Sequence, residues 1–547
     1  MPELMSDPNL PTPDLKKSRP ELFNSLLLCI CLTIAIFLRW PMVAGAAKHL
    51  DSDLAVDGLA LRQLVEEGQW RWHYPGTPHI GTAPMILSLP AVALMGDGPK
   101  SLVFAGLAAN LLLIIATYLI ALKFNGRWPA FFAGIAMAAG GLGQVWLSAR
   151  VTGGHLLAAA WMAWAWYFWT IAINSVSIRP WLLFGLFCGL GLWVDSIFLL
   201  GLAGLFAASL AESWKNRRSI TLKTRLLQAF SFSAMLPAGM LLTSLGDGEN
   251  SYGSQFELSR DANSIIEHTR ILVMDCLPRL FFGRSAQGLD QINWPDQPFK
   301  NENHLTFILI AFALSIAAII LKIRSRSNQR VLNNSLKHSL WLGFATLLIL
   351  NLIAFVLNTN IFNSDNYRYL VLLLPIFGVS VASIAADGRF QLTRRLILVV
   401  FSVLLGNDVY NWQIYASLRE SQSDAIQQEQ IKKDRIQTSR AMPLEDIFVT
   451  PGNGLPPIVN GTFEADYWVV YKSIYLFRLP LNSGRPFGFY PDRFKSISPK
   501  NPSYLVISDN DISRQMLASV RNDNFIERFE SPNYIVLKRD PKQIKAR

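Results

Sequence analysis

Three aspartates follow the first long apolar run of the chain. Asp51, Asp53 and Asp57 lie in the stretch "AKHLDSDLAVDGLALRQLVEEGQW", residues 47–70. Acceptor side chains precede an apolar series that Gly68 closes, so this stretch predicts a helix. On that helix Asp53 and Asp57 lie one turn apart on one face. A carboxylate held there can act as a general base that takes a proton from an incoming nucleophile.

A structural role is the alternative for these acids. Asp51 or Asp53 would then cap the helix, and the other acids would be solvated. Beside a lipid-embedded bundle, however, desolvation makes an unpaired acid costly, and acids kept there are usually functional. The sequence therefore favours a functional role for a carboxylate of this stretch.

Apolar runs of roughly 18 or more residues recur along most of the chain and indicate a polytopic membrane protein. Hydrophobic residues make up 51% of the sequence and charged residues 16%, whereas soluble proteins carry about 25% charged residues. The net charge of +11 lies largely in short loops, where Lys and Arg orient helices, so nucleic acid is not an expected partner. The four cysteines form neither a disulfide framework nor a zinc-ligand pattern.

The basic loops set the predicted topology. Residues 1–20 are interpreted as a disordered cytoplasmic tail, whose Lys and Arg send the first span outward. Tracing about eleven spans in and out leaves each basic loop on the cytoplasmic side. The predicted spans cover residues 22–44, 102–122, 129–147, 155–173, 181–194, 197–210, 226–245, 305–321, 340–357, 370–386 and 396–410. Residues 21–410 thus form the membrane domain, with a first outer loop at 45–100 and a large outer loop at 246–304.

Residues 82–95 are apolar but, at roughly 14 residues, short for a crossing. Counting them as a span would reverse every later loop and place the basic clusters outside, so we expect an interfacial or re-entrant helix. Arg39, at the outer end of the first span, is expected to be an interfacial anchor. Asp195 either lines a cavity or ends a helix in water.

The chain changes character after residue 410. Residues 411–547 are polar and contain three β-type stretches, "YWVVYKSIYLF", "SYLVIS" and "NYIVLKR", with helical patterns at 417–439 and 513–521. Strands that alternate with helices predict a small α/β domain, which the topology places outside the cytoplasm. The predicted fold class is mainly α, a polytopic membrane helix bundle with a small extracytoplasmic α/β C-terminal domain.

The stretch "LDSDLAVDGLALRQLVEEG", followed by "YPGTPHIGTAPMILSLPAVALMG", resembles the first outer loop of the GT-C glycosyltransferases. The likeness is to bacterial members of the glycosyltransferase 39 type, related to protein O-mannosyltransferases and the lipid A aminoarabinose transferase. The stretches "LSARVTGGHLL", "NYRYLVLLLP" and "EADYWVVYKSIYLF" are similar to later motifs of that type, in the same order. The resemblance implies a GT-C-like bundle, a polyprenyl-phosphate sugar donor and a loop acid as catalytic base. Asp53 occupies the matching position, with Asp51 as its neighbour.

Two positions depart from the family pattern. Leu54 stands where the family has Glu, and Pro84 replaces an acid often found after Gly-Thr. These changes put a pair of carboxylates, and a divalent metal held by them, in question. No metal ligand is assigned, and Asp57 is the alternative second acid.

The phosphate of the implied donor requires positive charge, because negative charge builds on it as the glycosyl bond breaks. Arg supplies this charge through its planar fork of donors. Arg368, beside Tyr369, and Arg150, near His155, are both predicted at the outer face, and His79 is a further candidate donor. Each arginine has the alternative role of snorkelling to lipid headgroups, and each histidine that of an ordinary interface residue.

We therefore expect a membrane glycosyltransferase of a bacterial inner membrane, which moves a hexose or pentose from a polyprenyl-phosphate donor to an acceptor on the extracytoplasmic side. The acceptor is a protein, a lipid or a glycan, and the sequence does not select among them. Two alternatives stay open. A transporter or flippase would show repeated halves with charges near mid-membrane. A non-catalytic descendant of the transferase fold would account for Leu54 and Pro84.

Overall fold

The structure is a computed structural model of the 547-residue chain. It describes residues 15–44, 46, 50, 52–75, 77–149, 154–173, 175, 177–215, 229, 258–259, 261–282, 331–361, 364–386, 406, 463–476, 484–487, 504–508, 525–530 and 534–539. The predicted spans at 226–245, 305–321 and 396–410 lie almost wholly outside these residues, so the full number of spans stays a prediction.

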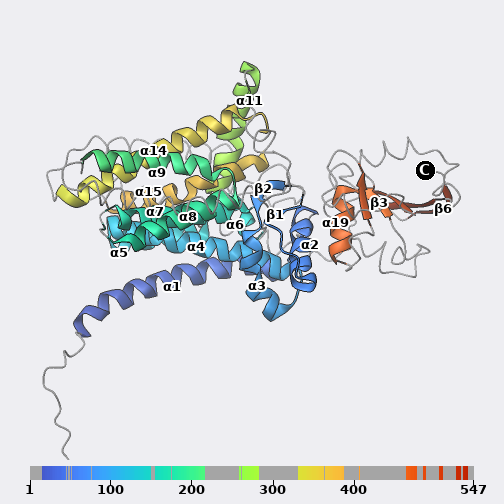
Figure 1. Cartoon of the computed structure of the whole chain (residues 1–547), viewed down its shortest axis with the longest axis horizontal. Helices are drawn as coiled ribbons and strands as arrows, with labels where there is room; N and C mark the ends of the chain where they lie inside the picture. Colours follow the sequence, from blue (N-terminus) through green and yellow to red (C-terminus); the bar gives the residue numbers. More distant parts are fainter. Residues whose placement is uncertain are drawn as a thin grey trace, which may run out of the picture.

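A bundle of apolar helices forms most of the described chain (Figure 1). Its helices are α1 (Leu15–Ala44), α4 (Pro99–Asn125), α5 (Arg127–Ala139), α6 (Leu142–Ala149), α7 (His155–Ala172), α8 (Ile178–Val194), α9 (Phe198–Lys215), α14 (Val331–Leu357), η5 (Ser364–Leu373) and α15 (Leu374–Ala386). Among the described residues, four segments are long and apolar enough to cross a membrane, at Glu21–Trp40, Pro99–Asn125, Leu336–Leu357 and Asn366–Ala386. These helices make the chain an integral membrane protein.

Burial separates the central helices from the peripheral ones. Only 22% of the apolar window in α1 is buried, whereas the share is 67% in α4 and 72% in the segment formed by η5 and α15. Large apolar side chains such as Leu22 and Phe37 of α1 are exposed, as expected of a helix that faces lipid. The central helices α4 and α15 therefore organise the bundle, and α1 lies at its edge.

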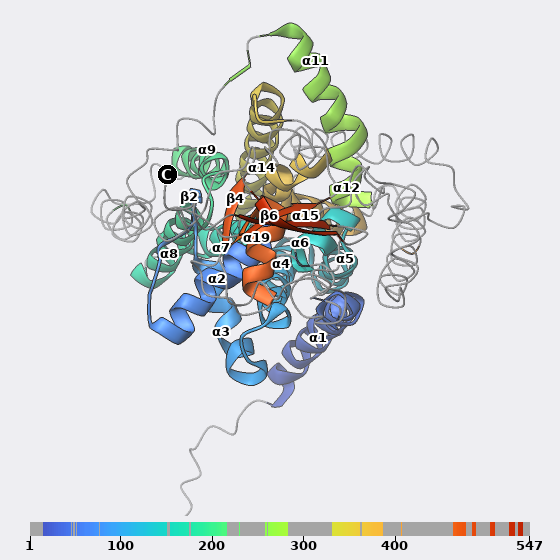
Figure 2. The same ribbon diagram turned by 90° about the vertical axis from the view of Figure 1, so that its right-hand side faces the viewer.

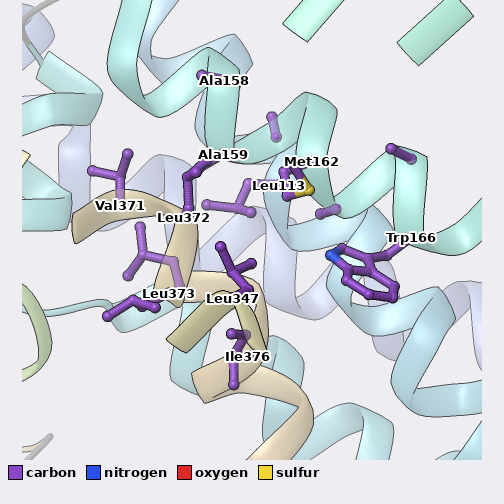
Figure 3. Packing of buried hydrophobic residues seen from close by; sticks show 14 of the residues in the cluster. Leu113, Ala158, Ala159, Met162, Trp166, Leu347, Val371, Leu372, Leu373 and Ile376 are labelled. Carbon is purple, nitrogen blue, oxygen red and sulfur yellow. The ribbon is translucent and has the colours of Figure 1, made fainter. Parts of the chain in front are cut away.

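Small residues and one large ring fill the core around α7. Ala158, Ala159, Met162 and Trp166 of α7 point toward Leu113 of α4 and Leu347 of α14 (Figure 3). Val371, Leu372 and Leu373 of η5 and Ile376 of α15 close the same cluster. Alanines on α7 let the neighbouring helices approach closely, which favours helix packing where no hydrophobic effect drives association.

Basic side chains gather at one end of the bundle. The Nε atom of Arg127 donates to Asn24 Oδ1 at 2.8 Å, and Lys337 Nζ lies 2.9 Å from Asn125 Oδ1. Lys123 Nζ donates to the carbonyl of Thr170 at 2.7 Å. Loops that the topology assigns to one side of the membrane thus meet at one end, although their assignment to the cytoplasm stays a prediction.

The segment predicted to be the first outer loop lies at the opposite end. It consists of α2 (Ser52–Glu67), a hairpin of β1 (His73–Tyr74) and β2 (Thr77–Gly81), and α3 (Ala83–Met95). The helix predicted between the acceptor side chains and Gly68 is confirmed as α2, and Gly68 ends it with a φ of 67°. The amide of Gln69 donates to the Gln63 carbonyl at 3.1 Å, as in a left-handed helix cap. The predicted short apolar helix is α3, with Pro84 in its first turn, where the missing N–H costs nothing.

The prediction of one continuous span at 129–147 is wrong. Helix α5 ends at Ala139, Gly140 has a φ of 65°, and α6 begins at Leu142. At the break the backbone of Gly141 packs against α12 (Leu277–Phe282). A Cβ on Gly141 would lie only 2.3 Å from the Leu280 carbonyl oxygen. The cluster of glycines in "AAGGLGQ" was the sequence signal for this break.

Two further elements lie between α9 and α14, in the segment predicted to be the large outer loop. Helix α11 (Ala262–Ile271) continues through the π-helical turn η4 (Leu272–Cys276) into α12. Asp261 caps α11, because its carboxylate accepts from the Ser264 amide at 2.9 Å. Helix α12 packs on α6 and η5 and so returns to the bundle.

A five-stranded mixed sheet lies in the C-terminal region, with strand order β4-β3-β5-β7-β6. Its strands are β3 (Phe463–Asp466), β4 (Gly484–Phe487), β5 (Tyr504–Ser508), β6 (Phe525–Glu530) and β7 (Tyr534–Arg539). The two predicted strands "SYLVIS" and "NYIVLKR" are β5 and β7. We use "C-terminal unit" for this sheet together with α19 (Tyr467–Leu476). The domain boundaries at residues 410 and 411 stay a prediction.

The prediction of a strand for "YWVVYKSIYLF" is wrong, because Tyr467–Leu476 form α19. Aromatic and β-branched residues favoured a strand locally, but Val470, Tyr471, Ile474 and Tyr475 recur with helical spacing and are all buried. Figure 1 and Figure 2 show α19 between α2 and the sheet.

A second apolar core joins the C-terminal unit to the first outer loop. It contains residues of α2, the hairpin, α4, α19 and the sheet, among them Leu54, Leu59, Tyr74, Leu102, Phe463, Tyr471, Ile474, Tyr475 and Val506. Residues far apart in the sequence therefore share one buried cluster at the hairpin end of the bundle.

The contact between α9 and α14 yields a stability prediction. A Cβ on Gly343 would lie 2.5 Å from the Trp166 ring and 2.7 Å from the Gly204 carbonyl oxygen, which belongs to the backbone of α9 and cannot turn away. Gly343→Ala is therefore expected to lower the free energy of unfolding by about 1–3 kcal/mol. Thermal unfolding of the detergent-solubilised protein measures the effect.

Leu342→Ala is the matched control, because Leu342 is adjacent on α14 but exposed. Equal melting temperatures for Gly343→Ala and the wild type would contradict this packing of the two helices.

Candidate functional site

Helix α2 carries the predicted acids, and burial separates their roles. Asp53 lies in the first turn and is partly exposed, where the positive end of the helix dipole favours a carboxylate. Asp57 is buried, so the interpretation of Asp57 as a solvated acid is wrong. The side chain of Asp51 lies outside the described residues.

Tyr74 of the hairpin lies close to Asp57. Burial raises the pKa of the Tyr74 hydroxyl well above its usual value, and the negative charge of Asp57 raises that pKa further. Tyr74 therefore stays protonated at physiological pH and keeps a hydrogen-bond donor beside the acid. This pairing of α2 with the hairpin was not predicted.

The hairpin is fixed against the end of α8. The indole N–H of Trp193 donates to the Trp72 carbonyl at 2.9 Å, and the hydroxyl of Thr82 donates to the Arg71 carbonyl at 2.5 Å. Ile80 of β2 pairs with Asp195 in an antiparallel bridge. The backbone of the first outer loop is thereby held beside Asp195.

Asp195 and His155 form a buried pair at this end of the bundle. The Oδ2 atom of Asp195 contacts His155 Nδ1, and its Oδ1 atom accepts from the Ile197 amide at 3.0 Å. Both residues are buried, with exposed fractions of 5% for His155 and 1% for Asp195. An ionised Asp195 carboxylate accepts a hydrogen bond from Nδ1–H of His155, and this bond fixes the orientation of the imidazole ring. The other ring nitrogen, Nε2, is then the atom that can exchange a proton or bind a ligand.

The start of α7 places His155 in this pair. Gly154 has a φ of 68°, and a Cβ there would lie 2.9 Å from a methyl group of Val194. A residue with a side chain would be strained by the backbone and would also collide with the end of α8. Glycine thus brings His155 against Asp195.

Aromatic rings and cations alternate along η5 beside this pair. The ring centroid of Tyr369 lies 5.7 Å from that of His155, edge to face. The guanidinium carbon of Arg368 lies 5.4 Å from the Tyr369 centroid, and that of Arg279 lies 4.5 Å from the Tyr367 centroid. The arrangement places positive charge and hydrogen-bond donors together, as recognition of an anion requires.

The predicted site residues are only partly brought together. The structure gathers His155, Tyr369 and Arg368, and it adds Asp195 as the partner of His155. The side chains of His79, in β2, and of Arg150 lie outside the described residues. Arg279, which is buried on α12, was missed, because no pattern distinguishes it from other loop arginines.

The interpretation of Arg39 as an interfacial anchor is wrong. Its side chain is fully buried and donates to Ser148 Oγ at 2.7 Å and to the Ala138 carbonyl at 2.6 Å. Neutral acceptors from α5 and α6 surround the guanidinium, which therefore links α1 to the two helices on either side of the break at Gly140. A single sequence does not reveal such a network.

The two departures from the family pattern have structural consequences. Leu54 is fully buried in the second apolar core, and Pro84 is buried in the first turn of α3. Apolar contacts thus occupy the positions of the two acids. Among the described residues no group of three or more His, Cys, Asp or Glu side chains suits a metal ion.

Comparisons with known proteins give a structural likeness and no sequence match. No family model and no curated protein matches the chain. The crystal structure of ArnT from Cupriavidus metallidurans bound to undecaprenyl phosphate is similar with a TM-score of 0.56 at 11% identity, covering 94% of this chain and 97% of ArnT. The apo structure of the same ArnT gives a TM-score of 0.56 at 12% identity, with 95% and 98% covered. The chain therefore has the fold of this ArnT, which agrees with the polytopic helix bundle predicted from the sequence.

The buried pair leads to a stability prediction. Asp195→Ala removes the acceptor of both His155 Nδ1 and the Ile197 amide in a buried environment. We expect the free energy of unfolding to fall by about 3–5 kcal/mol, as when one partner of a buried pair is removed. Asp195→Asn, which keeps an acceptor for the Ile197 amide, should lose less. Thermal unfolding in detergent measures both.

Asp261→Ala is the control, because Asp261 is an exposed carboxylate that caps α11. Hydrogen bonds from the amide and hydroxyl of Ser264 hold the pKa of Asp261 below its usual value. The cap is therefore intact above the unfolded pKa of about 3.9 and is lost only as the pH falls through the lower folded pKa. Equal losses for Asp195→Ala and Asp261→Ala at pH 7 would contradict the buried pair.

Proposed function

We propose that the protein is a membrane glycosyltransferase. It moves a hexose or pentose from a polyprenyl-phosphate donor to an acceptor, a protein, lipid or glycan, on the extracytoplasmic side of a bacterial inner membrane. The N-terminus is cytoplasmic and the C-terminal unit extracytoplasmic. The donor's tail stays in the bilayer while the acceptor arrives from water, so the reaction belongs at the rim of the bundle.

One observation carries this proposal. The acids of α2, the pair of His155 and Asp195, and Arg368 all lie at the hairpin end of an apolar bundle whose fold is that of ArnT, a protein crystallised with undecaprenyl phosphate. A transporter would instead need charged groups along a path through the membrane. The described charged groups favour the transferase.

Asp53 acts as the general base in this proposal. Its carboxylate takes the proton of the acceptor hydroxyl as that oxygen attacks the anomeric carbon. The bond between the anomeric carbon and the phosphate oxygen breaks, and its electron pair leaves with the lipid phosphate. Asp51 orients Asp53, and Asp57, buried beside Tyr74, fixes the helix that carries it.

The leaving phosphate gains a negative charge as the bond breaks, because a diester with one charge becomes a monoester with a second ionisable oxygen. Arg368 balances this charge through its fork of donors. In its imidazolium form, His155 donates from Nδ1 to Asp195 and presents Nε2 as a further donor, with Tyr369 fixing the ring from its side. Arg150 and His79 are further proposed contacts of the donor or acceptor.

A non-catalytic descendant of the fold is the second candidate, and the burial of Leu54 and Pro84 in apolar contacts favours it. Asp53 distinguishes the two candidates. A non-catalytic descendant needs at most a carboxylate that the helix dipole favours in the first turn of α2, whereas the transferase needs the basicity of Asp53.

Asp53→Asn tests the catalytic proposal. The change keeps the shape of the side chain but removes its basicity, so the transfer rate should fall by about 10²–10⁴-fold. Transfer is measured by mass spectrometry of envelope glycans and glycoproteins from cells with equal protein levels. Asp261→Asn is the control, and a wild-type glycan profile for Asp53→Asn would reject catalysis by this residue.

Arg368→Ala tests the phosphate contact. Loss of a charged hydrogen-bond donor should weaken binding of undecaprenyl phosphate by about tenfold or more. Native mass spectrometry of the purified protein with that lipid gives the affinity. Arg270→Ala, on exposed α11, removes an arginine paired with Glu267 and should leave the affinity unchanged. An equal affinity for both variants would contradict the role of Arg368.

A further inference from the structure

Helix α2 is held mainly by the C-terminal unit. Among the described elements α19 is its principal neighbour, while α4 and the hairpin contact α2 less extensively. We propose that the contact between α19 and α2 positions Asp53, so that the C-terminal unit is part of the transfer site. This inference rests on the proposed function.

The apolar half of the contact is close. The Tyr475 ring lies on the backbone of Gly58, where a Cβ would be only 2.6 Å from the ring. Tyr471 and Tyr475 are both buried in the core that contains Leu54 and Leu59. Any side chain larger than glycine at position 58 would therefore push the two helices apart.

The polar half of the contact centres on Arg62, which we call the Arg62 clamp. Its Nη2 atom donates to the Tyr475 carbonyl at 2.8 Å, and its Nε atom donates to Asp97 Oδ2 at 2.8 Å. The guanidinium carbon lies 4.8 Å from the Tyr475 ring centroid, and the Tyr475 hydroxyl lies 3.5 Å from Asp97 Oδ1. Three separate segments, α2, the turn between α3 and α4, and α19, thus meet at one guanidinium.

Burial strengthens the clamp. The side chains of Arg62 and Asp97 are only 12% and 7% exposed, so solvent and salt screen their interaction less than in a surface ion pair. The planar guanidinium also fixes direction, because separate nitrogen atoms serve Tyr475 and Asp97. A lysine would keep the charge and lose this geometry.

The Arg62 clamp positions Asp53, the proposed base, because both residues belong to helix α2. Arg62 and Asp53 belong to the same uninterrupted helix, whose C-terminal part carries the clamp and whose first turn carries Asp53. A shift of α2 by about 1 Å would misplace the base and is enough to cost on the order of 100-fold in rate. Arg62 and Tyr475 are therefore positioning residues and do not touch substrate.

The test compares Arg62→Ala, Arg62→Lys and Gly58→Val with Glu67→Ala, an exposed control on the same helix. The full-length protein is reconstituted with a polyprenyl-phosphate sugar and assayed for kcat and KM, and hydrogen exchange is followed over residues 52–67. In Arg62→Ala and Gly58→Val we expect kcat to fall by about 10- to 100-fold. In each of these two variants the KM should change by less than about twofold. Exchange in α2 should quicken, Arg62→Lys should be intermediate, and Glu67→Ala should match the wild type.

A positioning role also predicts how the changes combine. In the Asp53→Asn background, Arg62→Ala should cause no further loss of kcat, because the group that it positions is already gone. Faster exchange in α2 with an unchanged kcat would overturn the positioning role and leave the proposed function intact. Additive losses of kcat in the double variant would also overturn the positioning role. A wild-type rate for Asp53→Asn would instead overturn the proposed function, and this inference with it.

Discussion

Desolvation is the constraint on which the structure depends. An apolar bundle cannot hold isolated charges, so ionised groups collect at its ends and are paired or hydrogen-bonded there. At the hairpin end, Asp195 is paired with His155 and Asp97 with Arg62. Fully buried Arg39 is surrounded by acceptors from neighbouring helices. The same constraint concentrates the chemically useful groups where a lipid-bound phosphate and a water-borne acceptor can meet.

The elements with strong periodicity were predictable from the sequence. The helices α2, α4, α7 and α14 follow from apolar patterns and caps, and the basic residues that orient the spans meet at one end of the bundle. The break at Gly140 and the helix α19 were not predicted, since close backbone approach and tertiary burial decide them. The resemblance to GT-C enzymes, drawn from short motifs, agrees with the fold.

The sequence predicted which residues belong to the candidate site, but it predicted only part of how they are arranged in space. His155, Arg368 and Tyr369 were singled out separately, and the structure joins them through Asp195 and η5. Asp57 pairs with Tyr74, and Arg62 pairs with Tyr475. These pairs link segments whose proximity could not be predicted from the sequence pattern. Leu54 and Pro84, which differ from the family pattern, serve apolar contacts, so the chemistry proposed here depends on one acid more heavily than in enzymes with two.

The most direct test of the central claim is a structure of the protein in lipid nanodiscs with a non-hydrolysable polyprenyl-phosphate sugar. The account predicts the phosphate within hydrogen-bond distance of Arg368 and His155 Nε2, about 3 Å, and the anomeric carbon facing the Asp53 carboxylate across the space for one acceptor hydroxyl. A phosphate bound away from Arg368, or an Asp53 carboxylate turned from the sugar toward open water, would contradict it.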